Sequence, residues 1–146
     1  MRRFLMMLAC WVVAACWSLP SAAADSPDVP AGDARGVREV IQAQFDAFAA
    51  DDAKRAFSYA TPQLREAFGS ADRFIEVVRS AYPVVYRHAT VGFLKPERVD
   101  GSLVQGVHLT DERGVLWLAL YRLERQRDKS WRISACQLLP TQGRVA

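Results

Sequence analysis

The stretch Val115-Leu116-Trp117-Leu118-Ala119-Leu120-Tyr121-Arg122-Leu123-Glu124 decides the fold. Successive side chains of a β-strand point to opposite faces of the sheet, so this stretch divides into two sets. One set is Trp117, Ala119, Tyr121 and Leu123, and the other begins with Leu116, Leu118 and Leu120. The leucine set continues into Arg122 and Glu124, so we expect the Trp117 face to point into the protein. A strand that is apolar on both faces is typical of the centre of a covered sheet.

Turn signals place three further strands around this one. Asp100-Gly101 predicts a two-residue hairpin turn, because such a turn needs positive φ at both positions. The predicted strands span residues 85–95, 102–110, 115–126 and 130–139, and hairpin connections make them antiparallel. Alternation then predicts the inward residues of the two flanking strands: Leu103, Gln105, Val107 and Leu109 on one, and Trp131, Ile133, Ala135 and Gln137 on the other.

The preceding half of the chain has helical periodicity. Apolar residues predict a first helix from Ala34 to about Ala50 with Asp33 as its N-cap, and Asp51 or Asp52 caps a second helix that ends at Tyr59. Thr61-Pro62 and Gly69 bracket a third helix, and Ser70 begins a fourth that Pro83 ends. Three to four helices followed by hairpins predict an α+β fold, with the helices packed on one face of a curved four-stranded antiparallel sheet.

The first 24 residues have the layout of a secretory signal peptide. Two arginines precede the apolar residues 4–17, and small residues at 21–24 form a cleavage site between Ala24 and Asp25. Cleavage there places the protein in the periplasm or outside the cell. In an alternative interpretation, Val-Ala-Ala-Cys at 13–16 is a lipobox that lipidates Cys16 and anchors the protein to a membrane.

Composition argues for one nearly neutral domain. The chain of 146 residues has a formal net charge of +3, and residues 1–24 hold two of its 19 basic residues and none of its 16 acidic ones. The near-neutral remainder argues against nucleic-acid binding. We divide the chain into a signal peptide (1–24), a flexible linker (25–33), one α+β domain (34–140) and a C-terminal tail (141–146).

Five segments carry a family resemblance: Val40–Phe48, Asp51–Ala53, Ala56–Phe57, Ala81–Pro83 and Trp131–Ile133. They resemble the bacterial domain of unknown function 4864 family within the nuclear transport factor 2-like superfamily, over about residues 36–139. The resemblance implies a cone-shaped fold of helices on a strongly bent sheet. That superfamily includes isomerases, cyclases, dehydratases and non-catalytic binding domains, so the resemblance implies no particular activity.

The chain lacks the residues that ketosteroid isomerase chemistry requires. Ketosteroid isomerases of the superfamily need a carboxylate base and an oxyanion hole that includes a tyrosine of the first helix. The resemblance puts Phe45 in the place of that tyrosine, and the expected inward strand positions hold no Asp or Glu. We therefore predict no catalytic residue and rank a small-molecule enzyme of isomerase or cyclase type last.

Neither a metal site nor a cofactor site is predicted. Zinc sites need three or four ligands at close spacing, whereas the two histidines, His88 and His108, stand twenty residues apart without cysteines beside them. We interpret His88 as a structural residue rather than an acid–base group. Cys136, the one cysteine after residue 24, is interpreted as a small hydrophobe of the last strand rather than a reactive thiol.

The remaining candidate residues indicate binding functions. Neutral polar residues are expected inside the cone and would orient a small apolar ligand: Gln44, Tyr59, Gln105, Tyr121 and Gln137. Leu116, Leu118 and Leu120 are expected on the outer sheet face and predict a homodimer through that face. The sequence thus favours an exported, non-catalytic ligand-binding or accessory domain first, and a dimeric interaction or structural module second.

Overall fold

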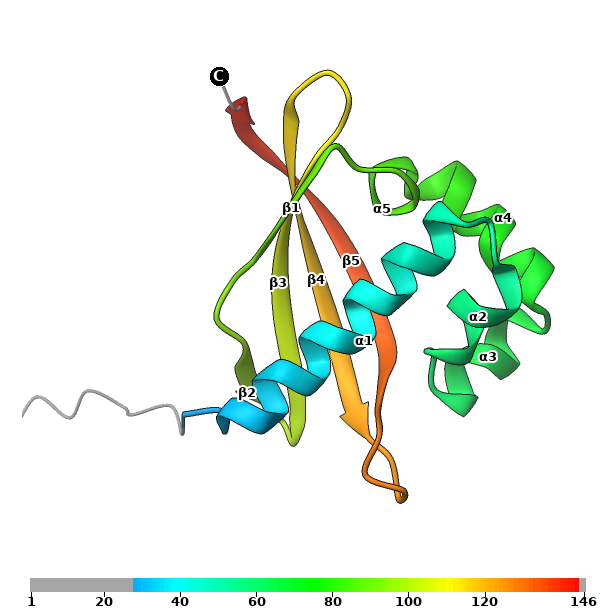
Figure 1. Cartoon of the computed structure of the whole chain (residues 1–146), viewed down its shortest axis with the longest axis vertical. Helices are drawn as coiled ribbons and strands as arrows, with labels where there is room; N and C mark the ends of the chain where they lie inside the picture. The colour runs from blue at the N-terminus through cyan, green and yellow to red at the C-terminus, as the bar shows by residue number, and fades with distance from the viewer. Residues whose placement is uncertain (1–27, 145–146) are drawn as a thin grey trace, which may run out of the picture.

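The computed structural model describes residues 28–144, so the predicted signal peptide, the cleavage site at Ala24 and Asp25, and Cys16 lie outside the described residues. The described chain is an α+β fold in which helices pack on an open antiparallel sheet, as predicted (Figure 1). The helices are α1 (Ala31–Ala49), α2 (Ala53–Ser58), α3 (Pro62–Phe68), α4 (Ala71–Ala81) and α5 (Pro83–Tyr86). The strands are β1 (Thr90–Phe93), β2 (Glu97–Val99), β3 (Ser102–Thr110), β4 (Val115–Arg125) and β5 (Trp131–Arg144).

Capping residues set the ends of the short helices where the sequence predicts them. The Asp52 side chain accepts the amide N–H of Arg55 at the start of α2, at 3.1 Å. Thr61 and Ser70 do the same for α3 and α4, and Pro62 occupies the first position of α3. Gly69 ends α3 with a φ of +83°, a value that suits glycine because it has no Cβ.

The first helix begins earlier than predicted. Pro30 rather than Asp33 is the N-cap residue, and α1 therefore includes the last residues of the expected linker. Asp33 lies in the first turn, where a carboxylate interacts favourably with the helix dipole. Its oxygens lie 3.4 Å from an Arg125 nitrogen and 3.7 Å from an Arg98 nitrogen, so it ties α1 to β4 and β2.

The sheet has the order β1-β3-β4-β5. Strand β2 also pairs with β3, at residues 102–104, whereas β1 pairs with residues 107–110 of that strand. The predicted single strand over residues 85–95 is wrong, because Pro83 begins the helical turn α5 instead of ending the region of helices. Pro96 has no N–H to donate, and it separates β1 from β2. The sheet therefore has five strands rather than four, and β5 continues to Arg144, past its predicted end at residue 139.

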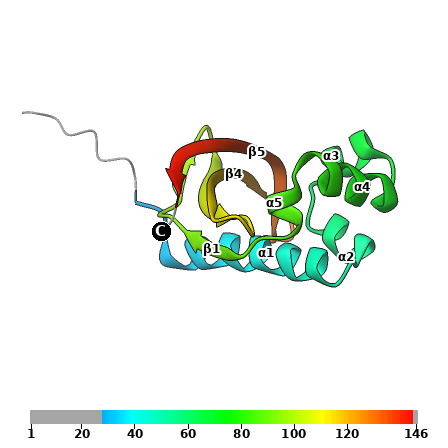
Figure 2. The same ribbon diagram turned by 90° about the horizontal axis from the view of Figure 1, so that it is seen from above.

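The core lies between α1 and the inward faces of β3, β4 and β5. From α1 it takes Val37, Ile41, Phe45 and Phe48, and from the sheet Leu103, Val107, Leu109, Ala119, Tyr121, Leu123, Trp131 and Ile133. Seen from above, β5 arches around β4 while α1 runs along the opposite side, so the sheet is strongly curved (Figure 2). Helices α2, α3 and α4 gather beyond β5 at one end of α1 (Figure 1).

Two glycines of α1 provide a matched test of this packing. A Cβ at Gly36 would lie 2.9 Å from Cδ1 of the buried Trp131 ring, whereas a Cβ at Gly32 meets nothing within 4 Å. We expect Gly36→Ala to lower the free energy of unfolding by about 1–3 kcal/mol, since the ring must shift. Gly32→Ala should raise it by about 0.5 kcal/mol through helix propensity. Urea denaturation of both variants checks this, and equal effects would contradict the close contact between α1 and β5.

Candidate ligand site

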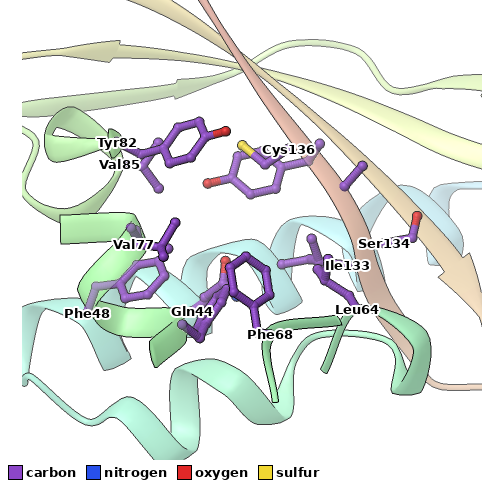
Figure 3. Close-up of a pocket in the computed structure, with 14 residues that line it drawn as sticks. Gln44, Phe48, Leu64, Phe68, Val77, Tyr82, Val85, Ile133, Ser134 and Cys136 are labelled. Carbon is purple, nitrogen blue, oxygen red and sulfur yellow. The ribbon is translucent and has the colours of Figure 1, made fainter. Parts of the chain in front are cut away.

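An apolar cavity of about 270 Å³ lies between the helices and the sheet (Figure 3). Helices α1, α3, α4 and α5 and strands β4 and β5 supply 13 of its 14 lining residues, and Tyr82 lies between α4 and α5. Nine are apolar: Phe48, Leu64, Phe68, Phe74, Val77, Val78, Val85, Ile133 and Ala135. Five can hydrogen-bond: Gln44, Tyr82, Tyr121, Ser134 and Cys136. A small concave site with an apolar lining and few polar groups is typical of small-molecule binding.

The chain between α2 and α3 holds the helices against the edge of the sheet. The Thr61 N–H donates to the Ile133 carbonyl at 2.9 Å, and the Ile133 N–H donates to the Tyr59 carbonyl at 2.8 Å. This short parallel pairing centres on Ala60 opposite Ile133. Helix α3 then leaves the sheet edge with Leu64 and Phe68 on its cavity side, because residues four apart share one helix face.

A second anchor lies at the other end of the cavity, where α5 meets the end of α1. The Arg87 guanidinium donates to the Phe48 carbonyl at 2.7 Å and so satisfies a carbonyl group at the C-terminus of α1. Tyr86 donates its hydroxyl hydrogen to Asp51, and both Arg79 and Arg87 stack on the Tyr86 ring, at 5.1 and 4.7 Å from its centroid. These contacts hold Val85 and Tyr82 over the cavity.

A β-bulge at Ser134 determines which β5 side chains reach the cavity. Leu123 pairs with Ile133, but the preceding residue Arg122 pairs with Ala135, so Ser134 is the extra residue. Alternation reverses at this point. The inward orientation predicted for Gln137 is therefore wrong, because its side chain is exposed, and Ala135 is also exposed although it borders the cavity. Because pairing resumes one residue later, Cys136 stands opposite Tyr121 and lines the cavity.

The predicted ligand-binding residues do not form one group. Gln44 and Tyr121 both line the cavity. Gln105 is fully buried elsewhere and donates to the carbonyls of Leu94 and Gly106, at 2.6 and 2.8 Å. Tyr59 borders a shallow groove between α1 and the β4–β5 hairpin, and Gln137 lies exposed opposite Leu120.

Three polar cavity residues were missing from that prediction. Cys136 and Ser134 were missed because strict alternation hides a bulge. Tyr82 was missed because it was assigned to the end of a helix rather than to a lining. In Figure 3, Tyr82 and Cys136 lie on one side of the cavity and Phe68 and Leu64 on the other.

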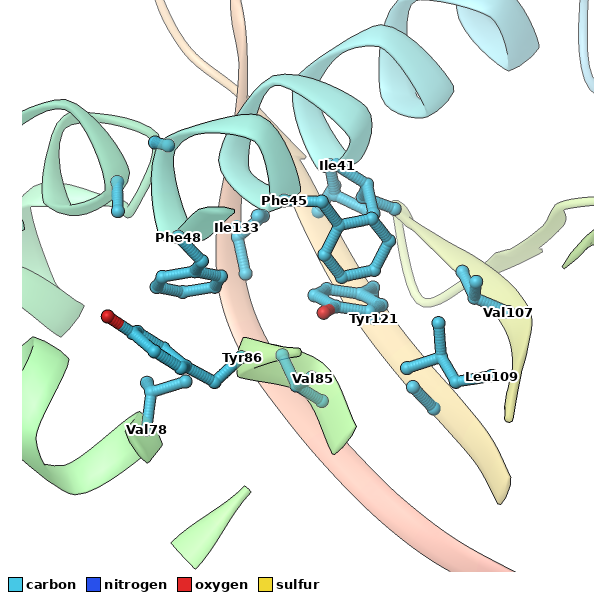
Figure 4. Packing of buried hydrophobic residues seen from close by; sticks show 14 of the residues in the cluster. Ile41, Phe45, Phe48, Val78, Val85, Tyr86, Val107, Leu109, Tyr121 and Ile133 are labelled. Carbon is cyan, nitrogen blue, oxygen red and sulfur yellow. The ribbon is translucent and has the colours of Figure 1, made fainter. Parts of the chain in front are cut away.

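Tyr121 is the most deeply buried polar group of the cavity. Its side chain is 1% exposed, and its ring packs against Phe45 with the centroids 6.0 Å apart (Figure 4). The hydroxyl makes no hydrogen bond of normal geometry among the described residues, and its polar neighbour is the Cys136 thiol, a weak acceptor. Burial raises the pKa of Tyr121 well above its ordinary value, and the neighbouring Cys136 adds to that rise, so the hydroxyl keeps its proton.

Cys136 and Gln44 are neutral polar groups of the cavity as well. Burial raises the pKa of Cys136 to about 12, and the Tyr121 hydroxyl offsets part of that rise. The Gln44 amide nitrogen donates to the Ala56 carbonyl at 3.1 Å, which fixes the orientation of the side chain. The arrangement can therefore orient a neutral ligand by hydrogen bonds.

The histidines lie outside this lining. His88 packs edge-to-face on Phe45 with the ring centroids 4.7 Å apart, and burial lowers its pKa. His108 pairs with Leu118 across β3 and β4. Among the described residues, no three His, Cys, Asp or Glu side chains gather to hold a metal ion. Over the same residues, the helices are all too short or too polar to cross a membrane.

The fold and the cavity define an α+β protein whose helices enclose a small apolar site against one face of an antiparallel sheet. Its family model matches residues 30–146, and the chain belongs to the family described as Domain of unknown function (DUF4864). Neither the search of curated proteins nor the search of solved structures gave a significant match.

The neutral state of Cys136 can be tested by alkylation. A thiol with a pKa of about 12 is about 0.01% thiolate at pH 8, and only the thiolate reacts. In the chain that begins at Asp25, we expect the rate of reaction with iodoacetamide to rise about tenfold per pH unit from pH 8 to pH 10, without levelling. The same protein in urea should react faster and level off near pH 9. A plateau near pH 9 in the folded protein would contradict the burial of the sulphur.

Proposed function

We propose that this protein binds a small, largely apolar molecule in the cavity beneath α3 and α4, without transforming it. One observation carries the proposal: the apolar cavity of about 270 Å³ contains a deeply buried hydroxyl that no described residue pairs with. A pocket that only completed the core would be expected to fill with side chains, because protein interiors are packed to high density. The neutral polar groups support binding over acid–base catalysis.

The same volume sets the size of the ligand. An engineered apolar cavity of about 150 Å³ is large enough to bind benzene. The larger cavity beneath α3 and α4 therefore suits one substituted ring or a branched chain of similar bulk. The curvature of the sheet around β4 supports our further proposal that the fold is a nuclear transport factor 2-like cone (Figure 2).

Filling the cavity should abolish binding. Val77 lines the cavity, and Val91 on β1 is 37% exposed and absent from its lining. We expect ethylbenzene to give saturation-transfer NMR signals with the wild-type protein and with Val91→Phe, and to lose at least nine-tenths of that signal with Val77→Phe. Thermal denaturation confirms that both variants are folded. Equal signals from the two variants would overturn the proposal, and so would the absence of a wild-type signal with both ethylbenzene and acetophenone.

We also propose that the protein acts outside the cytoplasm. The arginine pair, apolar run and small residues before Asp25 support export, although they lie outside the described residues. Exposure of the outer sheet face supports a homodimer as the second candidate function: Leu116, Leu118 and Leu120 on the central strand β4 are each only partly buried.

Native mass spectrometry of protein purified from its own cell envelope tests both statements. Removal of the signal peptide should give an N-terminus at Asp25, whereas lipidation would leave acylated Cys16 as the first residue. A dimer that Leu118→Lys converts into a monomer would support assembly through the outer face, since a buried unpaired charge is costly. An uncleaved N-terminus would contradict export by signal peptidase, and a wild-type monomer at micromolar concentration would exclude the dimer.

A further inference from the structure

Every residue that lines the cavity is uncharged. The 14 lining residues include no Asp, Glu, Lys, Arg or His. Arg79 and Arg87, which lie outside this lining, both pair with Asp51, and Arg79 also donates to the Tyr86 hydroxyl. Burying an ionised group without a counter-charge costs far more than burying a neutral polar group. The cavity therefore disfavours a ligand that places a carboxylate, phosphate or ammonium group inside it.

The cavity contains one deeply buried donor that lacks an acceptor. The Tyr121 hydroxyl makes no hydrogen bond of normal geometry among residues 28–144, its polar neighbour Cys136 is only a weak acceptor, and the side chain is 1% exposed. Leaving a buried hydroxyl unpaired costs free energy that a bound acceptor would recover. Because burial keeps the proton on the oxygen, this hydroxyl can donate a hydrogen bond to any acceptor that enters the cavity.

The other polar groups of the cavity are less suited than Tyr121 to donate a hydrogen bond to a ligand. The Ser134 hydroxyl donates to the Arg122 carbonyl at 3.2 Å, and the Gln44 amide nitrogen donates to the Ala56 carbonyl. Cys136, directly across the β4–β5 pair, offers a weak S–H donor. Tyr82 is only half-buried and also borders an outer groove beside Pro83 and Trp117. Tyr121 is therefore the donor that a ligand held deep in the cavity meets.

We propose that the ligand is a small uncharged molecule with an apolar body and one strong hydrogen-bond acceptor, of the ketone, aldehyde or ester class, and that the Tyr121 hydroxyl donates to that acceptor. This inference rests on the proposed binding function. It adds the chemical class of the ligand and assigns the residue that recognises it.

Three ligands of similar size separate the contributions: ethylbenzene, acetophenone and benzoate. We expect acetophenone to bind the wild-type protein about five- to tenfold more tightly than ethylbenzene in calorimetric titration, the effect of one buried hydrogen bond. Benzoate should bind at least tenfold more weakly than acetophenone. Tyr121→Phe should make acetophenone and ethylbenzene bind equally, whereas the matched variant Tyr59→Phe, at a tyrosine outside the cavity lining, should preserve the preference.

The infrared carbonyl band of bound acetophenone supplies a readout that does not depend on the folding of a variant. In the wild-type protein this band should shift to lower frequency than in hexane, because a hydrogen bond weakens the C=O bond. Equal affinity for acetophenone and ethylbenzene together with an unshifted band would overturn the role of Tyr121 while leaving ligand binding intact. Preferential binding of benzoate would overturn the inference of an uncharged ligand. Failure of both ethylbenzene and acetophenone to bind would instead overturn the proposed function itself.

Discussion

Two main-chain hydrogen bonds at Ile133 hold the helical arm, formed by α2, α3 and α4, to the sheet. Strand β5 is an edge strand, and its outer amide and carbonyl groups need partners or cover. The segment from Tyr59 to Thr61 covers this edge at Ile133 and supplies the hydrogen-bonding partners of the Ile133 amide and carbonyl groups. Helix α3 has no fully buried residue of its own, so its packing alone gives little to fix its position. The site depends on this pairing, because the arm supplies much of the cavity lining.

The neighbouring bulge couples that attachment to the chemistry of the cavity. Up to Ile133, β5 turns its apolar side chains under α1, where Trp131 packs against Gly36. After the extra residue Ser134, Cys136 takes the inward position opposite Tyr121. A bulge also bends its strand and increases the local twist, which suits the arch of β5 around β4 (Figure 2). One irregular residue thus lies beside the anchor of the arm and determines what the cavity contains.

Local signals in the sequence predicted most of the helical half. Asp52, Thr61 and Ser70 cap helices through hydrogen bonds to residues three positions away, so the information is contained within a few residues. Asp100-Gly101 likewise turns the chain through its own backbone, with φ values of +48° and +78°. These features follow from short segments and do not depend on the rest of the fold.

The errors arose where distant contacts decide the structure. Residues 83–86 have the composition of a strand, yet Tyr86 packs on Phe48 and Arg87 binds the end of α1, which a helical turn allows. Gln137 was placed inward by alternation, and the bulge three residues earlier reversed its direction. A bulge leaves little trace in the pattern of apolar residues, so the half of the site contributed by β5 required the structure.

Burial alone does not distinguish a binding group from a structural one. Within residues 28–144, four buried side-chain atoms lack partners: His88 Nδ1, Gln105 Oε1, Trp117 Nε1 and the Tyr121 hydroxyl oxygen. Gln105 was predicted on the same inward face as Tyr121, but its amide nitrogen is bound to two carbonyls and it borders none of the pockets described above. An unpaired atom enclosed by protein cannot be reached by a ligand, whereas one beside an apolar cavity can. Among the residues that line the cavity, Tyr121 combines the unmet hydrogen bond with adjoining space, and that combination is why the most deeply buried polar residue of the cavity is also the residue assigned to recognition.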